Sequence, residues 1–145
     1  MKTKFQVRIL LVSFTLLGAI FLMSYKTPVQ HNTVWSSPKS ADTLKNPLKG
    51  NVASIEKGKK IYDQYCVVCH GQKGRGNGIA ASTLNPRPAD HASAKFQAQT
   101  DGAIYWKLTH GNQAHSAMTS YAKILSNTQR WEVVDYIRTL KAKTK

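Results

Sequence analysis

The chain has little negative charge and few cysteines. Only 7 of its 145 residues are Asp or Glu, against 21 Lys and Arg, which gives a formal net charge of +14. This excess predicts a partner or surface of negative sign. The basic residues are spread along the sequence, without an arginine-rich block or an RNA-type aromatic motif. We therefore predict no binding of nucleic acid.

The long uncharged apolar run lies at the N-terminus. In residues 1–25, three basic side chains precede the run ILLVSFTLLGAIFLM. This order is typical of a secretory signal or an N-terminal membrane anchor. We predict an uncleaved anchor, and the alternative is a cleaved signal and a soluble periplasmic protein. The positive-inside rule places the rest of the chain on the periplasmic side of the cytoplasmic membrane in both cases.

The next segment, residues 26–53, has few residues that could form a core. Pro28, Pro38 and Pro47 stand among Ser, Thr, Asn and Lys. This composition predicts an extended, proline-containing linker. The alternative is that part of the segment packs on the following domain through Trp35. Residues 54–145 are predicted to form one small domain.

The sequence predicts a helix at the start of this domain. Ser54 can cap a first helix that runs into Cys66. Apolar residues fall on one face of this helix at helical spacing. Gly58 lies inside the helix, where glycine costs stability, so it predicts a close approach by another element.

The sequence also predicts a helix at the end of the domain. Residues 71–88 read as a loop, and a short helix is predicted over residues 101–110. Ser126 and Gln129 have the form of a capping box at the start of a last helix. The long connection between the first and last helices has too few apolar residues for an ordinary core. Another group is therefore expected to fill the middle of this all-α domain.

The only two cysteines, Cys66 and Cys69, are followed directly by His70. A zinc site would need a second close pair of ligands, and only His110 and His115 offer one. A thioredoxin-like pair requires a βαβ context, and a disulfide would leave the histidine unexplained. Cys-x-x-Cys-His is instead the c-type haem attachment pattern, in which two thiols bond the vinyl groups and the imidazole reaches the iron. We predict one haem c (heme c), covalent through Cys66 and Cys69, with His70 as an iron ligand.

With this motif the domain resembles the class I monohaem cytochromes c, which are small bacterial electron carriers. The resemblance covers about residues 54–142 and includes the segments GQKGRGNG, NPRPAD, TDGAIYWKLTHG and NTQRWEVVDYIRTL. It implies a cytochrome c fold over residues 54–145, with three to five short helices around one covalently bound haem. The first and last helices would cross near the haem, where Gly58 and Tyr62 would meet Trp131 and Tyr136.

The resemblance also implies a second iron ligand, a methionine before the last helix. Met118 is the only methionine beyond the N-terminal run, so it is predicted to complete a His/Met pair. Thr119 stands where the family often has proline, which predicts a less rigid ligand loop. His91, His110 and His115 stay open as alternative ligands, although a solvated or hydrogen-bonded role is preferred for each.

The proximal histidine, His70, is expected to donate its second ring nitrogen to a backbone carbonyl. The family often uses a proline in the loop after the haem motif. Ile79 stands at that position here, and Pro86 and Pro88 follow further on. The acceptor is therefore left open.

The predicted function is electron transfer without enzymatic catalysis, by a free carrier or by a subunit of a larger oxidoreductase complex. Predicted partners are the membrane and the acidic faces of a quinol-oxidising complex, a terminal oxidase or a periplasmic reductase. One basic edge is predicted where the terminal helices meet, at Lys57, Lys59, Lys60, Lys141, Lys143 and Lys145. Two alternatives stay open: a haem protein with an open iron site, such as a gas sensor or peroxidase-like enzyme, and a non-haem thiol or metal module.

Overall fold

The computed structural model describes residues 35–112 and 117–142. The predicted anchor, the first part of the predicted linker and His115 lie outside the described residues, so those predictions stay predictions. Within the described ranges, no helix is both long and apolar enough to cross a membrane. Helices and loops make up these ranges, and no strand occurs in them. The prediction of an all-α domain is confirmed.

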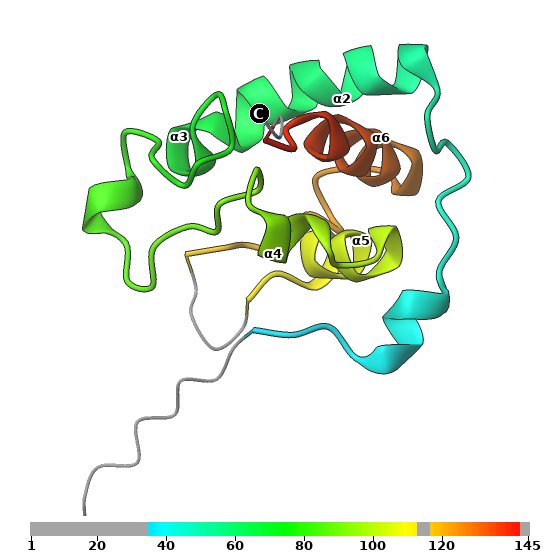
Figure 1. Cartoon of the computed structure of the whole chain (residues 1–145), viewed down its shortest axis with the longest axis horizontal. Helices are drawn as coiled ribbons and strands as arrows, with labels where there is room; N and C mark the ends of the chain where they lie inside the picture. Colours follow the sequence, from blue (N-terminus) through cyan, green and yellow to red (C-terminus); the bar gives the residue numbers. More distant parts are fainter. Residues whose placement is uncertain (1–34, 113–116, 143–145) are drawn as a thin grey trace, which may run out of the picture. The chain divides into compact units, whose positions relative to one another are not determined.

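Five α-helices and two short 3₁₀ helices are present in the described ranges (Figure 1). In chain order they are η1 (Lys39–Thr43), α2 (Val52–Tyr65), α3 (Val67–His70), η2 (Ala81–Thr83), α4 (Ala94–Gln97), α5 (Asp101–His110) and α6 (Asn127–Thr139). The helix predicted over residues 101–110 is confirmed as α5. The predicted capping box is also present, because the Ser126 and Gln129 side chains each bond the other residue's backbone N–H.

The N-terminus of α2 differs from the prediction. The helix begins at Val52, and Asn51 is its cap, so the prediction of Ser54 as the capping residue is wrong. The Asn51 side-chain oxygen accepts a hydrogen bond from the backbone nitrogen of Ser54 at 3.1 Å. Asparagine is at least as favourable a cap as serine, and here it comes first in the chain. Ser54 instead occupies a buried position in the first turn.

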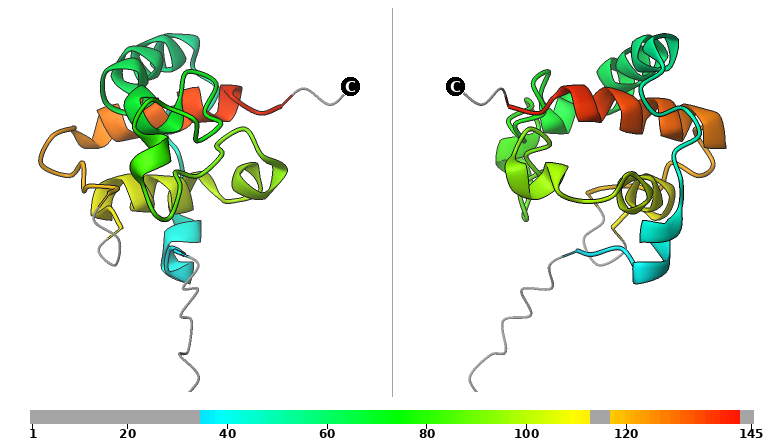
Figure 2. Two further views of the ribbon diagram at one scale, coloured as in Figure 1. Left: turned by 90° about the vertical axis from the view of Figure 1, so that its left-hand side faces the viewer. Right: turned by 45° about the vertical axis from the view of Figure 1, so that its right-hand side comes forward.

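The first and last helices pack closely against each other. Both views of Figure 2 show α2 lying against α6. A Cβ atom on Gly58 would lie 1.9 Å from the Glu132 carbonyl oxygen and 3.1 Å from the Tyr136 Cβ. Tyr62, one turn further on, meets Tyr136 edge to face with ring centroids 5.1 Å apart. The close approach predicted at Gly58 is therefore confirmed.

The core is concentrated on α6, which packs against α2 on one side and α5 on the other (Figure 1). Val133, Val134 and Ile137 of α6 are almost completely buried. Trp131 stacks on Tyr105 of α5, with ring centroids 4.0 Å apart. These contacts anchor α5 and therefore fix one wall of the space that the haem motif faces.

Residues 35–50, which we call the strap, are folded against the helical domain rather than extended away from it. The strap contains η1, and its Ala41 is buried. The Thr100 hydroxyl at the start of α5 donates to the Asp42 carboxylate at 2.7 Å. The linker predicted over residues 26–53 thus differs from the structure from Trp35 onward, and the part described here packs on the domain.

Polar contacts explain how a segment with so few apolar residues is held. Asn46 donates to Asp135 of α6 at 2.7 Å and lies 3.3 Å from Asp101 of α5. Asp101 also accepts from the Arg138 guanidinium at 2.6 Å. Burial raises the pKa of Asp135, and the bond from Asn46 opposes that rise. The strap is thus tied to two helices at once, which a hydrophobic pattern does not reveal.

Candidate cofactor site

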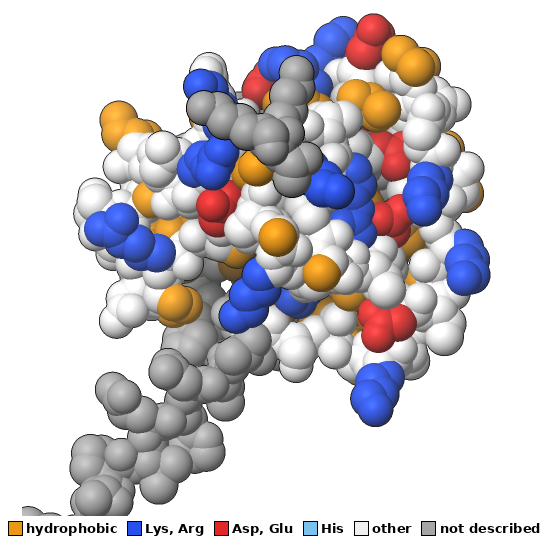
Figure 3. All heavy atoms as spheres, in the orientation of Figure 1, with side chains coloured by type: hydrophobic (Ala, Val, Ile, Leu, Met, Phe, Trp, Pro, Cys, Tyr) orange, Lys and Arg blue, Asp and Glu red, His pale blue; other side chains and the backbone are white. Residues whose placement is uncertain are grey.

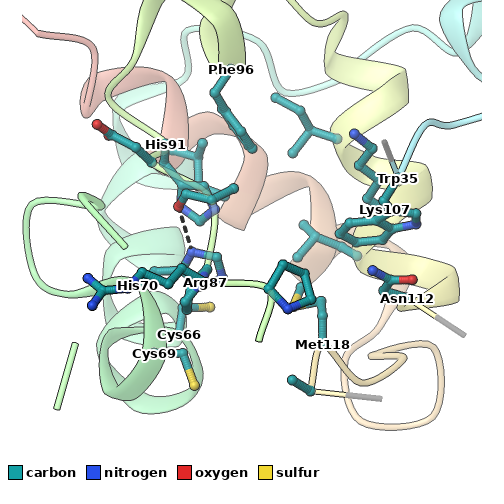
Figure 4. A pocket seen from close by; sticks show the side chains of 18 of the residues that line it. Trp35, Cys66, Cys69, His70, Arg87, His91, Phe96, Lys107, Asn112 and Met118 are labelled. Carbon is teal, nitrogen blue, oxygen red and sulfur yellow. Dashed lines mark hydrogen bonds between the residues drawn. The ribbon is translucent and has the colours of Figure 1, made fainter. Parts of the chain in front are cut away.

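A cavity of about 420 Å³ opens where the sequence lacks an apolar core. Such a volume is typical of small-molecule and cofactor sites. Six parts of the chain line it: the strap through Trp35, the α2–α3 junction, the loop and short helix that follow, α5, the loop before α6, and α6 through Ile137 (Figure 4). Cys66, Cys69, His70 and Met118, the four residues predicted as the site, all lie in its lining.

The two cysteines and the histidine are placed by one helical turn. The backbone N–H groups of Cys69 and His70 both donate to the Cys66 carbonyl, at 3.2 and 2.8 Å. Both thiols are free, and burial raises the pKa of Cys66 to about 12. Within residues 35–112 and 117–142, no group of three or more His, Cys, Asp or Glu side chains is placed to hold a metal ion.

A backbone hydrogen bond orients the His70 ring. Its Nδ1 lies 3.1 Å from the Ala89 carbonyl oxygen, drawn as a dashed line in Figure 4. As the donor in this bond, Nδ1 carries the proton, and Nε2 keeps its lone pair for a metal. Burial lowers the pKa of His70, and the bond to Ala89 acts in the opposite direction. The acceptor that the sequence left open is thus Ala89, the residue after Pro88.

His91 lies on the same side of the pocket as His70. The two imidazole rings are stacked, with centroids 4.0 Å apart and planes 20° apart. The Nδ1 atom of His91 is 3.3 Å from the Tyr62 hydroxyl, and that hydroxyl is also 3.2 Å from the Gly71 carbonyl oxygen. This position does not suit a ligand on the opposite face of a haem. A hydrogen-bonded role was predicted, but nothing in the sequence signalled the stacking on His70.

The loop after α3 returns its backbone to the haem motif. Gly76 donates to the His70 carbonyl at 2.9 Å, and Gly78 donates to the Cys69 carbonyl at 3.0 Å. The Val68 carbonyl accepts from Ala80 at 2.9 Å. These bonds satisfy the carbonyl groups that a one-turn helix leaves free, and they hold the turn in place.

Met118 is partly buried and packs against the hydrophobic core. In Figure 4 its side chain lies across the pocket from His70. Its carbonyl accepts from the backbone of Asn112 at 2.8 Å. Further along the loop, Tyr121 donates to the Leu108 carbonyl at 2.9 Å. The loop is therefore bonded on both sides of Thr119, without the proline that is common at that position.

A glycine makes this loop closure possible. Gly111 ends α5 with φ of 67°, a backbone conformation that residues other than glycine rarely adopt. A Cβ atom there would lie 2.6 Å from the Ser120 backbone nitrogen and 2.8 Å from the Met118 carbonyl oxygen. The Ser120 hydroxyl adds a bond of 2.6 Å to the Thr109 carbonyl.

His110 is exposed and stacks on Trp106, and it does not line the cavity.

A model of the cytochrome c family matches residues 55–141, which is more than half of the chain. The chain belongs to the cytochrome c family. It is therefore a c-type cytochrome that transfers electrons, and its fold is that of a cytochrome c domain. Membership in the family implies covalent haem c, and the two cysteines that this needs are Cys66 and Cys69.

Two solved structures are similar to this cytochrome. One is a chain of the Kuenenia stuttgartiensis reducing HAO-like protein complex Kustc0457/Kustc0458, with 32% sequence identity and a TM-score of 0.60 over 68% of this chain. This cytochrome spans only 50% of the length of that chain. The other is the KustC0563 c-type cytochrome, with 27% identity and a TM-score of 0.50 over 59% of this chain and 98% of that chain. A search among curated proteins gave no match.

The pocket fits a haem on the evidence of its own side chains. Two free thiols stand on one turn, beside an imidazole whose second nitrogen is already bonded to Ala89. Ile104, Leu108 and Ile137 supply apolar surface to the lining. A large apolar ring held by Cys66, Cys69 and His70 would fill the space that the polypeptide leaves open.

Proposed function

We propose that this cytochrome transfers electrons through one haem c attached to Cys66 and Cys69, with His70 and Met118 as the axial ligands of the iron. Bound in this way, the haem supplies a one-electron Fe(III)/Fe(II) couple. The observation that carries the proposal is the shared cavity. It brings together two free thiols, an oriented imidazole and the partly buried Met118, whose carbonyl accepts a hydrogen bond from Asn112.

Each ligand has a distinct effect in this proposal. The Ala89 carbonyl accepts a hydrogen bond from the Nδ1–H group of His70, which fixes the ring and would increase its basicity toward the iron. The Met118 thioether favours Fe(II) and therefore raises the reduction potential. His70 and Met118 would together hold the iron from the protein and leave it no place for a substrate, which suits an electron carrier.

Covalent attachment is tested on the full chain, expressed with a haem-attachment system. We expect the wild-type haem to stay with the polypeptide after extraction with acidified acetone, and the intact mass to rise by one haem. Cys66→Ser and Cys69→Ser should each keep one thioether bond, and the double variant should lose its haem in the extraction. Haem that is extractable from the wild type would contradict the proposal.

We further propose that residues 1–25 anchor the cytochrome on the periplasmic side of the cytoplasmic membrane. The support is the order of basic residues and the apolar run in that segment. The intact mass of the protein purified from membranes decides between an anchor and a cleaved signal. A mass that includes the N-terminal segment supports the anchor. A shorter protein in the soluble periplasmic fraction supports cleavage, and haem-free protein in the cytoplasm contradicts export.

The proposed redox partners have acidic docking faces. Figure 3 shows Lys and Arg side chains spread over one face of the molecule, with fewer Asp and Glu. In the predicted basic edge, Lys60 and Lys141 are exposed, whereas Lys59 is bonded to Asp63 at 2.5 Å. Lys143 and Lys145 lie outside the described residues. The edge therefore offers fewer free charges than its sequence suggests.

The docking proposal is tested through association kinetics. We expect electron transfer with a quinol-oxidising complex, a terminal oxidase or a periplasmic reductase to slow as salt increases. Lys60→Glu should slow association more than Lys39→Glu, a matched change at an exposed position in the strap. Equal rates for the two variants, or no dependence on salt, would contradict docking through this edge.

A role as a fixed subunit is the alternative to a mobile carrier. It is supported by the likeness to a chain of a multi-protein complex. Size-exclusion chromatography of the detergent-solubilised native protein distinguishes the two. Elution as a small single species supports the mobile carrier, and elution with other proteins in fixed ratio supports the subunit.

A further inference from the structure

Lys107 of α5 stands in an unusual environment for a lysine. It lines the cavity and is half-buried, and burial lowers its pKa. Its Nζ donates to the Gln99 side-chain oxygen at 2.5 Å. Within the described ranges it takes part in no ion pair with a carboxylate. Its partner Gln99 is neutral, and because lysines are rarely buried without a compensating charge, the surroundings of this amine favour an anion beside it.

Trp35 of the strap holds the same amine from another direction. The Lys107 Nζ lies 5.2 Å from the centroid of the Trp35 ring, within the range of a cation–π contact. Trp35 also lines the cavity. It precedes residues 55–141, the part of the chain that the family model matches, so family membership assigns it no role. The strap that carries this ring is tied to the helices through Asn46 and Asp42.

The charge around the cavity favours an anionic group. Besides Lys107, the lining contains Arg87 and Lys95, and both of these are exposed. The acidic residue in the lining is Asp90, which lies 3.9 Å from Arg75. An exposed cation is screened by water, whereas a half-buried amine interacts more strongly with a partner beside it. Among the cations of the lining, Lys107 is thus the best placed to hold an anion inside the pocket.

We propose that Lys107 binds a carboxylate of the cofactor, and that Trp35 and Gln99 position its amine for this contact. The inference rests on the proposed function, because the anion in question is a propionate of the bound haem. A haem carries two propionates, and burying either one without a partner is costly. A charge-assisted hydrogen bond from the lysine removes that cost. The strap then contributes to cofactor binding through Trp35.

The test compares haem-loaded full-length variants. Lys107→Met removes the charge at similar volume, Lys107→Arg keeps the charge, and Lys39→Met removes an exposed charge from the strap. The readouts are the propionate-bending mode in the resonance Raman spectrum and the reduction potential. We expect Lys107→Met to shift the mode and to lower the potential, because a cation in the pocket favours Fe(II). Lys107→Arg should restore most of both, and Lys39→Met should leave both at the wild-type values.

A second pair of variants leaves α5 intact. Trp35→Ala removes the ring over the amine, and Trp35→Phe keeps an aromatic face. We expect Trp35→Ala to shift the propionate mode in the same direction as Lys107→Met but by less, and Trp35→Phe to stay near the wild type. This pair decides the question if Lys107→Met does not retain haem.

The outcomes separate this inference from the function on which it rests. If the wild type holds no covalent haem, the proposed function fails and the inference fails with it. If haem is attached and Lys107→Met matches Lys39→Met in both readouts, the function stands and the carboxylate site is wrong. The inference is also wrong if Trp35→Ala and Trp35→Phe both match the wild-type Raman spectrum.

Discussion

The side of the pocket that holds Cys66, Cys69 and His70 and the side that holds Met118 are built in different ways. The first is one helical turn, in which the His70 backbone donates to the Cys66 carbonyl at 2.8 Å. The second is a loop closed by contacts between separate segments, such as the bond of 2.9 Å from Tyr121 to the Leu108 carbonyl. Local geometry places the thiols and the imidazole, whereas tertiary packing places the thioether. We call the side with Cys66, Cys69 and His70 the proximal side, and the side with the Met118 loop the distal side.

Because the two sides are built differently, we expect them to open at different free energies. Breaking the proximal turn requires the loss of helical bonds that continue from α2, such as the bond of 2.8 Å from the Cys66 nitrogen to the Tyr62 carbonyl. Opening the distal loop requires the loss of only a few bonds between separate segments, such as those from Tyr121 to Leu108 and from Ser120 to Thr109. Segments held by few bonds open at low free energy. We therefore expect the distal side to respond to substitution and to added ligands before the proximal side does.

The largest effect is expected on the helix crossing that supports the proximal side. In Gly58→Ala, the new methyl group would lie 1.9 Å from the Glu132 carbonyl oxygen, so α2 and α6 must move apart. We expect the free energy of unfolding to fall by about 3 kcal/mol, measured by denaturant titration of the holoprotein. Glu56→Ala, an exposed change on α2, should alter it by less than about 0.5 kcal/mol. Equal stability of both variants would contradict the role of this crossing.

The next effect concerns the distal side alone. Met118→Ala is expected to retain covalent haem and to bind cyanide about 100-fold more tightly than the wild type, as measured by optical titration. That factor corresponds to a methionine that leaves the iron in about 1% of wild-type molecules. Unchanged cyanide affinity would show that Met118 does not occupy the iron. Loss of the haem itself would contradict the independence of the two sides.

Two glycine substitutions test how the distal loop is closed. Gly111 and Gly50 have similar positive φ values, 67° and 78°, but only the Cβ of Gly111 would meet the distal loop. We expect Gly50→Ala to lower the free energy of unfolding by about 1 kcal/mol, which is the backbone cost, and Gly111→Ala by about 2 kcal/mol. Only Gly111→Ala should also speed cyanide binding, in stopped-flow measurements. Similar kinetics in both variants would contradict the role of Gly111 in loop closure.

The smallest effect is expected behind the proximal histidine. Tyr62→Phe removes a hydroxyl that lies 3.2 Å from the Gly71 carbonyl oxygen and 3.3 Å from His91 Nδ1. The loss of this hydrogen bonding should lower the free energy of unfolding by about 1 kcal/mol while the cyanide affinity stays at the wild-type value. Tighter cyanide binding in this variant would show that the two sides are coupled.

What the sequence predicted follows the same division between local and tertiary structure. The haem motif and the capping box at Ser126 depend on neighbouring residues, and the close approach at Gly58 is a tertiary contact that one glycine inside a helical pattern indicates. They could be predicted because the signal for each lies in the local sequence pattern. The cap of α2 was misplaced because Asn51 and Ser54 are both acceptable caps, and spacing does not rank them.

The features that could not be predicted depend on long-range contacts. The strap was interpreted as linker because its attachment is polar and depends on partners such as Asp135, 89 positions after Asn46. The stacking of His91 on His70 and the Ala89 acceptor depend on the path of the intervening loop. The place of Met118 was expected only through the family resemblance, because a single methionine has no spacing to interpret.

The most direct test of the proposed His70/Met118 site is the optical spectrum of the oxidised wild-type protein, scanned for the methionine–iron charge-transfer band. We expect the band to be present in the wild type and absent from Met118→Ala. A c-type haem spectrum without this band in the wild type would contradict Met118 as the sixth ligand, and would favour ligation by a second histidine or an open iron site.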